Sequence, residues 1–279
     1  MKPARLTYTI AILTCWYGTY PWYFPYFIHS CAYNPTIDFY IISDNKEAIP
    51  NKPKNVKLIC KPLEEINTIA SKKLDFTVNI KYPYKLCDFK PAYGFLFSEI
   101  TKGYDFWGHG DLDVIYGNIR DFITDELLQG FDIISPRPDW VPGCSLLFRN
   151  TEKMNTLFMQ SKDYQKVFTN DRHFCFDETN FCHHLFTEGY KYSEISTEIE
   201  SMMHVIKRME EKNEIKPHFD QYIVEGRPGK LKWHKGILTY RNQFEVLLYH
   251  LLKLKDVYQP KTVPTKILDT FYISPTRIF

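Results

Sequence analysis

"LTYTIAILT", residues 6–14, is the stretch that decides the fold class. Its β-branched and aromatic residues run without polar alternation, which predicts a strand covered on both faces, as in a parallel sheet. Further strands are predicted at "IDFYIISD" (37–44) and "NVKLIC" (55–60), and helices at "PWYFPYFIHSC" (21–31) and "LEEINTIASKKL" (63–74). This alternation predicts an α/β fold with an open, mostly parallel central sheet flanked by helices.

The second half of the chain continues this pattern less regularly. We expect strands at 104–109, 131–135 and 144–150, and helices at 90–100, 118–128, 152–168 and 177–188. Arg227-Pro228-Gly229 lies between two strand-like segments and predicts a hairpin. "QFEVLLYHLLKLK" (243–255) has apolar residues at helical spacing and predicts an amphipathic helix. No linker-like stretch divides the sequence, so we expect one domain with a more irregular C-terminal part.

Composition and charge argue against several classes of protein. The 279 residues are 44% hydrophobic with a formal net charge of +2, which gives no electrostatic basis for nucleic-acid binding. The seven cysteines form no CxxC pair, which favours a reducing compartment over a disulfide framework. Lys2 and Arg5 precede an apolar run, but no small-residue cleavage site follows, so a buried strand explains the run better than a signal peptide. No segment approaches the roughly 18 apolar residues of a membrane span, and we expect a cytoplasmic protein.

Polar or aromatic residues follow three of the predicted strands. Thr14 and Trp16 end the first strand region, Asp44 ends the second, and Gly110-Asp111-Leu112-Asp113 follows the strand at 104–109. Ligands in open α/β sheets bind outside the carboxyl ends of the strands. Each of these ends taken singly is explained by a solvated turn, but the three together predict one binding cleft.

The stretch "GDLDVIYG" (110–117) places two carboxylates at positions i and i+2. On a strand both would point to the same face. Charge at the end of a buried strand needs water, a basic side chain or a metal ion as its partner. Mg²⁺ and Mn²⁺ prefer carboxylate and phosphate oxygens, so a divalent ion is the partner that we favour.

Two blocks, "YPYKLCDFKPAYGFLF" (82–97) and "YDFWGHGDLDVIYGNIRDFIT" (104–124), carry a family resemblance. They resemble glycosyltransferases of the GT-A type and, more narrowly, a family of uncharacterised bacterial glycosyltransferase-like proteins often associated with surface-polysaccharide genes. The similarity extends from residue 7 to about 240, which implies a GT-A-like domain over residues 1–240, with a C-terminal helix and tail at 241–279 packed on it.

The resemblance implies a reaction and a set of binding residues. A sugar would move from a nucleotide-sugar donor to a hydroxyl of a glycan or lipid-linked acceptor, with Mn²⁺ or Mg²⁺ on the donor diphosphate. Asp111 and Asp113 would hold the ion and the diphosphate, and Trp16 and Asp44 would lie near the nucleoside. The nucleotide-sugar residues expected from the strand ends, the blocks and the resemblance are Thr14, Trp16, Asp44, Lys85, Asp88, Lys90, Asp111, Leu112 and Asp113.

The block at 84–94 contributes Lys85, Asp88 and Lys90 to this set. A lysine at this position would neutralise a phosphate or hold one of the two aspartates by charge pairing. The alternative is a helix start with solvated lysines.

A second acidic pair, Asp177-Glu178, lies at the start of the helix predicted at 177–188. One interpretation is simple N-terminal capping, because acids are favoured there by the helix dipole. The other makes one of the two the catalytic acid that faces the acceptor hydroxyl or the donor sugar. Neighbouring residues raise the question of a zinc site, but their Cys-x6-Cys spacing does not match a short zinc knuckle; they are Cys175, Cys182, His183 and His184.

A third metal ligand in many enzymes of this type is a histidine in the C-terminal part. His204, His218 and His234 are candidates, and we rank His234 first because "KLKWHKGIL" is aromatic and basic. The sequence has no GxGxxG, Walker or GxSxG motif, which argues against dinucleotide-binding, P-loop and hydrolase functions.

Two other functions stay open from the sequence. A metal-dependent phosphoesterase or nucleotidyltransferase would use the same carboxylates, and a glycan-binding protein would use the aromatic residues with a structural DxD. The segment 243–261 also has two interpretations. Its leucines either pack on the sheet, which we favour, or place a basic amphipathic helix with Lys253, Lys255 and Lys261 on the inner leaflet of a membrane.

Overall fold

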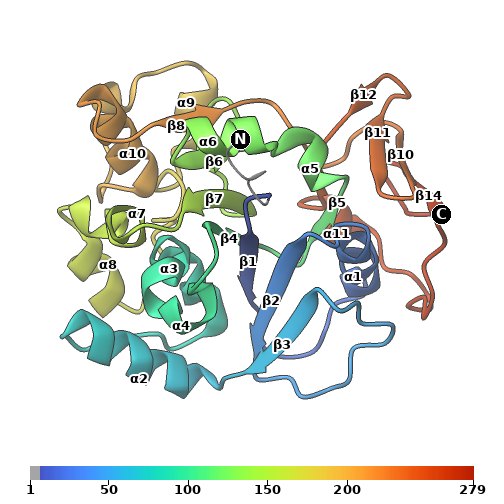
Figure 1. Cartoon of the computed structure of the whole chain (residues 1–279), viewed down its shortest axis with the longest axis horizontal. Coiled ribbons are helices and arrows are strands. Elements are labelled where there is room, and N and C mark those ends of the chain that lie inside the picture. The colour runs from blue at the N-terminus through green and yellow to red at the C-terminus, as the bar shows by residue number, and fades with distance from the viewer. Residues whose placement is uncertain (1–6) are drawn as a thin grey trace, which may run out of the picture.

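A seven-stranded sheet forms the centre of the structure, a computed structural model that describes residues 7–279 (Figure 1). Its strands, in spatial order, are β3 (Val56–Cys60), β2 (Ile37–Ser43), β1 (Ile10–Cys15), β4 (Phe106–Gly110), β7 (Ser145–Arg149), β6 (Ile133–Ser135) and β8 (Pro217–Phe219). β7 runs antiparallel to β4 and β6, and the other neighbouring pairs are parallel. The α/β fold with a mostly parallel central sheet is therefore confirmed.

β1 is covered on both faces, as its sequence predicts. Ile10 and Ile12 belong to one hydrophobic cluster, and Ala11 and Leu13 belong to another on the opposite face. Alternation of side chains across a strand explains this division. The predicted strand begins at Leu6, which, like Lys2 and Arg5, lies outside the described residues.

Helices and helical turns cover the two faces of the sheet (Figure 1). They are α1 (Phe24–Ala32), α2 (Leu63–Leu74), η1 (Pro83–Ala92), α3 (Tyr93–Leu96), α4 (Ser98–Thr101), α5 (Ile119–Phe122), α6 (Asp125–Gly130), α7 (Glu152–Asn155), η2 (Leu157–Gln160), α8 (Tyr164–Thr169), α9 (His183–Thr187), η3 (Tyr192–Glu194), α10 (Met202–Glu211) and α11 (Leu254–Val257). No helix within residues 7–279 combines the length and the hydropathy needed to cross a membrane.

Several predicted helices are shorter than expected. The helix predicted at 90–100 is a 3₁₀-helix over 83–92 followed by α3 and α4. Pro91 lies inside the 3₁₀ segment, and proline removes a backbone donor and disfavours a regular α-helix around it. The helix predicted at 177–188 is also wrong at its start, because α9 begins only at His183.

A small antiparallel sheet lies at one side of the molecule in Figure 1. It consists of β12 (Phe244–Glu245), β11 (Ile237–Tyr240), β10 (Leu231–His234) and β14 (Thr270–Ile273). Its hairpin turn is at Lys235-Gly236, with φ of +47° and +87°, and the hairpin predicted around Arg227-Pro228-Gly229 is wrong. Two consecutive positive φ values suit a tight hairpin turn, which glycine favours.

The amphipathic helix predicted at 243–255 is wrong. The segment forms β12, β13 (Leu248–His250) and α11, and β13 lies between β5 (Val114–Tyr116) and β9 (Ile223–Glu225) in a three-stranded sheet. All three residues of β13 are buried, so the segment shows no strand-like alternation that sequence analysis would detect. Packing of the leucines into the core is confirmed for Leu247, Leu248, Leu251 and Leu254. Within residues 7–279 this segment does not form the basic membrane helix.

Candidate active site

The carboxyl ends of β1 and β4 lie side by side. The two strands pair through Leu13 and His109, one residue before Thr14 and two residues before Asp111. Thr14 is buried at the end of β1. Beyond it the indole of Trp16 donates to the carbonyl of Thr19 at 3.0 Å.

Asp44, at the end of β2, belongs to the same loop region. Its carboxylate accepts a hydrogen bond of 2.9 Å from the backbone of Gly18, which has φ of +91°. The structure thus brings Asp44 to the loop that carries Trp16. In this structure its carboxylate shapes that loop.

Asp111 and Asp113 follow β4. Asp113 is buried, and the Asp111 side chain is 32% exposed. Asp111 Oδ1 accepts a 2.7 Å hydrogen bond from Lys90 Nζ. Asp113 Oδ2 accepts a 2.6 Å hydrogen bond from Lys255 Nζ and lies 3.3 Å from His250 Nε2. The Leu112 side chain between them is buried in the core, so it offers only its backbone to a ligand.

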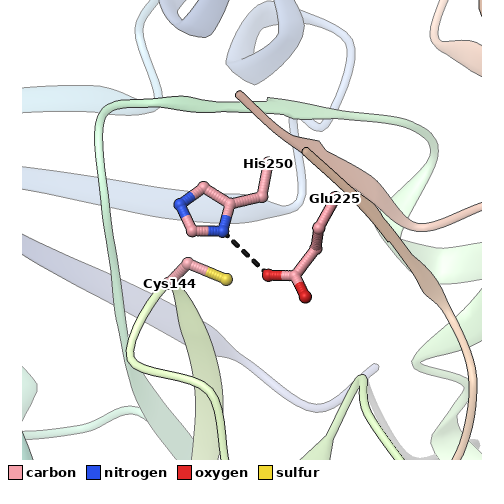
Figure 2. A group of neighbouring side chains, drawn as sticks. All are labelled: Cys144, Glu225 and His250. Carbon is pink, nitrogen blue, oxygen red and sulfur yellow. Dashed lines mark hydrogen bonds and ion pairs between the residues drawn. The ribbon is translucent and has the colours of Figure 1, made fainter. Parts of the chain in front are cut away.

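Strand register explains why His250 reaches Asp113. His250 of β13 pairs with Val114 of β5 and with Glu225 of β9. Cross-strand partners share a face, and His250 Nδ1 lies 2.9 Å from Glu225 Oε1 (Figure 2). The hydrogen bond to Glu225 leaves Nε2 directed at Asp113.

Three donor groups, Asp111, Asp113 and His250, offer ligand atoms that all lie within 4.8 Å of one another. Among residues 7–279, Asp111 Oδ2 and Asp113 Oδ1 accept no hydrogen bond. Two carboxylate oxygens and one imidazole nitrogen are a suitable donor set for Mn²⁺ or Mg²⁺. The residues present therefore fit a divalent ion.

The two aspartates have different electrostatic surroundings. Burial raises the pKa of Asp111 and the charge of Asp113 adds to this effect, although Lys90 opposes it. Burial also favours the neutral form of Asp113, but His250 and Lys255 outweigh it and hold the pKa of this carboxyl well below its usual range. Asp113 is thus held in its ionised form by these two partners.

Lys85 and Asp88 do not face this group. They form a buried ion pair of 2.8 Å in which both side chains are 0% exposed. Asp88 also accepts hydrogen bonds from the backbone of Phe174 and Phe176. The pair fixes the loop that leads to Asp177 and has no surface to offer to a ligand.

Lys90 connects the two acidic pairs. Besides Asp111, its ammonium donates to the carbonyl of Gly143 at 3.0 Å and lies 3.8 Å from Asp177 Oδ2. A Cβ at position 143 would lie 2.5 Å from Asp177 Oδ2, so the close approach of this carboxylate requires glycine.

Asp177 and Glu178 lie in a turn and not at a helix N-terminus, so the capping interpretation is wrong. Positive φ values at Asn180 and Phe181 turn the chain before α9 begins. Glu178 Oε1 accepts a hydrogen bond from the backbone of Gly143, and Glu178 Oε2 lies 2.7 Å from His183 Nε2.

The second pair is also split electrostatically. Burial raises the pKa of Asp177 well above its usual value. Burial acts in the same direction on Glu178, but the hydrogen bond and charge of His183 and the Gly143 amide outweigh it and lower its pKa to about 2. Pairs of carboxyl groups with opposite shifts are typical of sites that need one acid and one base.

The three histidines ranked from the sequence lie elsewhere. His204 Nδ1 is 2.8 Å from Ser201 Oγ on α10, and His218 Nε2 is 3.0 Å from Tyr222 Oη. His234 is exposed on β10, with Nδ1 2.7 Å from Thr270 Oγ1. The histidine that the structure places beside Asp113 is His250.

Sequence analysis missed His250 as a candidate ligand, Lys255 as a partner of Asp113, and Glu225. His250 and Lys255 lie in the segment that was interpreted as a helix. The histidine and lysines of "YHLLKLK", next to strand-like apolar residues, were the signal that the sequence offered. They reach Asp113 only through contacts between residues more than 100 positions apart, which the sequence does not show.

Comparisons with solved structures give distant similarities only. No curated protein matches the chain. Among solved structures, the chain is similar to the glycosyltransferase GlyE of Streptococcus pneumoniae TIGR4 in its apo form, with a TM-score of 0.37 and 12% identity over 77% of this chain and 46% of that chain. The chain thus spans less than half the length of that enzyme.

Two other similar structures are covered more fully. The galactosyltransferase LgtC, in complex with donor and acceptor sugar analogues, has a TM-score of 0.40 and 12% identity over 77% of this chain and 75% of that chain. Mouse xyloside xylosyltransferase 1 has a TM-score of 0.41 and 10% identity over 87% and 97%. A family model matches residues 12–279, and the chain belongs to that family, which is described as "Family of unknown function (DUF6625)".

Proposed function

We propose that the protein is a glycosyltransferase that binds a nucleotide-sugar donor through a divalent ion and transfers the sugar to a hydroxyl of a glycan acceptor. The observation that supports this most is the convergence of Asp111, Asp113 and His250 at the carboxyl end of β4. This is the position at which an open α/β sheet binds its ligands.

Asp111, Asp113 and His250 would hold Mn²⁺ or Mg²⁺. When bound, the ion supplies a Lewis acid for the charge that develops on the leaving diphosphate. Lys255 is about one-third exposed in its side chain while touching Asp113, so its ammonium is also available to a phosphate oxygen. Lys90 is buried and keeps Asp111 in place.

Asp177 is our candidate for the base that takes the proton of the acceptor hydroxyl. Its Oδ2 lies 3.8 Å from the Lys90 ammonium, which also donates to Asp111, and this shared contact supports a role close to the proposed ion. Burial raises the pKa of Asp177, and a higher affinity for a proton is what a general base needs. Glu178, bound to Gly143 and His183, would position this turn.

The nucleoside would lie near the loop after β1. Trp16 and Asp44 border this loop, and the indole offers a face for stacking. The surface-glycan or lipid-linked acceptor is supported by the sequence resemblance alone, and the cytoplasmic location by the seven cysteines without a CxxC pair.

Calorimetric titration with Mn²⁺ and a panel of nucleoside diphosphates tests the proposal. We expect a nucleoside diphosphate to bind only with Mn²⁺ present, and Asp113→Asn and His250→Ala to weaken that binding. Transfer should fall by about 10³-fold in Asp113→Asn, because the Lewis acid contributes several kcal/mol. Asp75→Asn, which changes an exposed acid after α2, is the matched control.

The outcomes separate the candidate functions. Diphosphate binding that is independent of Mn²⁺ and unchanged in Asp113→Asn would overturn the metal role. Glycan binding without any nucleotide affinity would favour a glycan-binding protein instead.

A further inference from the structure

We propose that Cys175, Glu178 and His183 form a second metal site, for zinc or another cation that binds thiolate and imidazole, separate from the aspartate site. The three side chains offer ligand atoms within 4.8 Å of one another. A mixed sulfur, nitrogen and oxygen donor set suits Zn²⁺ far better than Mg²⁺. The inference does not depend on the reaction proposed above.

The distances within this group match a tetrahedral zinc site. Cys175 Sγ lies 3.7 Å from His183 Nε2 and 3.3 Å from Glu178 Oε2, and the latter two atoms lie 2.7 Å apart. Zinc bonds of about 2.3 Å to sulfur and about 2.0–2.1 Å to nitrogen or oxygen place tetrahedral ligands about 3.3–3.6 Å apart. Only the nitrogen–oxygen pair needs to open, by roughly half an ångström on this estimate.

The backbone holds Cys175 in this position at a conformational cost. Cys175 has φ of +53°, a region that residues with a Cβ rarely occupy. The buried Asp88 carboxylate accepts hydrogen bonds from the amides of Phe174 and Phe176, on either side of the cysteine. An uncommon conformation that buried groups enforce is a reason to look for a function.

Among residues 7–279, Glu178 Oε2 and His183 Nε2 contact only each other and Cys175 Sγ. Glu178 Oε1 is held by the Gly143 amide, which leaves Oε2 for the group, and His183 packs edge-on against Trp140 with ring centroids 4.5 Å apart. Within residues 7–279 the only ion-pair partner of Glu178 is His183.

Solvent reaches this group, and binding of an ion releases protons to that solvent. The side chains of Glu178 and His183 are 21% and 33% exposed, so an ion can enter and a water molecule can complete its coordination. On binding, the ion displaces the thiol proton of Cys175, and any proton shared by His183 and Glu178, to solvent. No oxidation or reduction is involved.

A second group of the same residue types offers an internal comparison. Cys144, Glu225 and His250 also lie within 4.8 Å of one another (Figure 2). Both ring nitrogens of His250 are already engaged, by Glu225 and Asp113, and Glu225 is further paired with Arg137. This group orients His250, and its imidazole and carboxylate are also paired with residues outside the group. Among residues 7–279, Glu178 Oε2 and His183 Nε2 contact only members of the group around Cys175.

Titration of the full-length protein with Co²⁺, in excess Mg²⁺ to occupy the aspartate site, tests the proposal. A thiolate bound to Co²⁺ gives a charge-transfer band in the near ultraviolet. We expect the band to saturate at one Co²⁺ per chain and to disappear when Zn²⁺ is added. It should be absent in Cys175→Ser and present in Cys182→Ser and Cys144→Ser. His183→Ala, which changes a partly exposed side chain, should weaken binding at least tenfold and guards against misfolding of the cysteine variant.

Zn²⁺ should also raise the Tm of the unaltered protein but not that of Cys175→Ser, because a ligand that binds only the folded state stabilises it. Absence of the band, its survival in Cys175→Ser, or its loss in Cys144→Ser would each overturn the assignment. Nucleoside diphosphate binding with Mn²⁺ is measured separately on the unaltered protein, so the two proposals fail separately.

Discussion

Lys90 lies between two acidic pairs, Asp111 with Asp113 and Asp177 with Glu178, and the two pairs differ in their partners. In each pair burial raises the pKa of one carboxyl, while neighbouring groups lower the pKa of the other. Asp113 is held ionised by Lys255 and His250. Glu178 is held by a backbone amide and by His183.

This difference teaches what each pair is suited to bind. Among residues 7–279 the first pair keeps one carboxylate oxygen on each aspartate without a hydrogen-bond donor, beside the His250 imidazole. These oxygens suit a cation that also binds an anionic phosphate. In the second pair burial raises the pKa of Asp177, which lies beside a turn fixed by Asp88. Such a carboxyl suits proton transfer.

The largest expected effect comes from breaking the support of the second pair. Lys85→Met leaves the buried Asp88 carboxylate without its ammonium partner. Loss of one member of a buried ion pair costs about 3–5 kcal/mol, and we expect a Tm lower by roughly 10 °C.

Lys81→Met is the matched control, because the Lys81–Asp171 pair is exposed and should contribute about 0–1 kcal/mol. Differential scanning calorimetry compares the two variants. If both lose the same stability, Lys85 is not the support described here.

The next effect separates the members of the second pair. We expect Asp177→Asn to lower kcat by about 10²-fold, or about 2.7 kcal/mol, because asparagine cannot accept the proton. Glu178→Gln should lower kcat less than tenfold, since it alters only the position of the turn. Single-turnover kinetics compares the two variants, with nucleoside diphosphate affinity measured in parallel. Equal losses of kcat would contradict the assignment of Asp177 as the base and Glu178 as a positioning residue.

A smaller effect is expected at the support of the first pair. Glu225→Gln keeps a hydrogen-bond acceptor for His250 Nδ1 but removes the charge that pairs with Arg137. Partners of this kind typically contribute 10–100-fold to metal affinity, and we expect about tenfold weaker Mn²⁺ binding by electron paramagnetic resonance. Glu245→Gln, at an exposed acid of β12, should leave the affinity unchanged.

Much of the fold was predictable because it depends on local sequence. The strands at 37–44 and 55–60 correspond to β2 and β3. β2 is mostly buried in the sheet, which explains its apolar run, whereas β3 is an edge strand in which only Val56 is buried. The segment 243–255 was not predictable in this way. A short strand between two others is apolar on both faces, and its sequence cannot be told from that of a buried helix.

The site residues also fall into two sets, those that local sequence identifies and those that only tertiary contacts reveal. Asp111, Asp113 and Lys90 lie near strand or helix ends and were identified from sequence, and the structure brings them together. Lys85 and Asp88 have the same residue types but point into the core, which no spacing rule reveals. His250 joins Asp113 only through the pairing of β13 with β5, a tertiary contact that the sequence does not show.

The smallest expected effect is at His234, the histidine that sequence analysis ranked first as a metal ligand. His234 faces solvent on β10, and Thr270 Oγ1 lies 2.7 Å from its Nδ1. His234 is not one of the three residues whose ligand atoms converge at Asp111 and Asp113. We therefore expect His234→Ala to leave the affinity for Mn²⁺ within about twofold of that of the unaltered protein, and to change stability by about 0.5 kcal/mol or less. The same resonance titration applied to His250→Ala should show a much larger loss, because that side chain lies 3.3 Å from Asp113. A strong effect of His234→Ala together with a weak effect of His250→Ala would contradict the assignment of the ion to Asp111, Asp113 and His250. It would point instead to a metal site on the small sheet, and the first acidic pair would no longer differ from the second as a metal-binding pair.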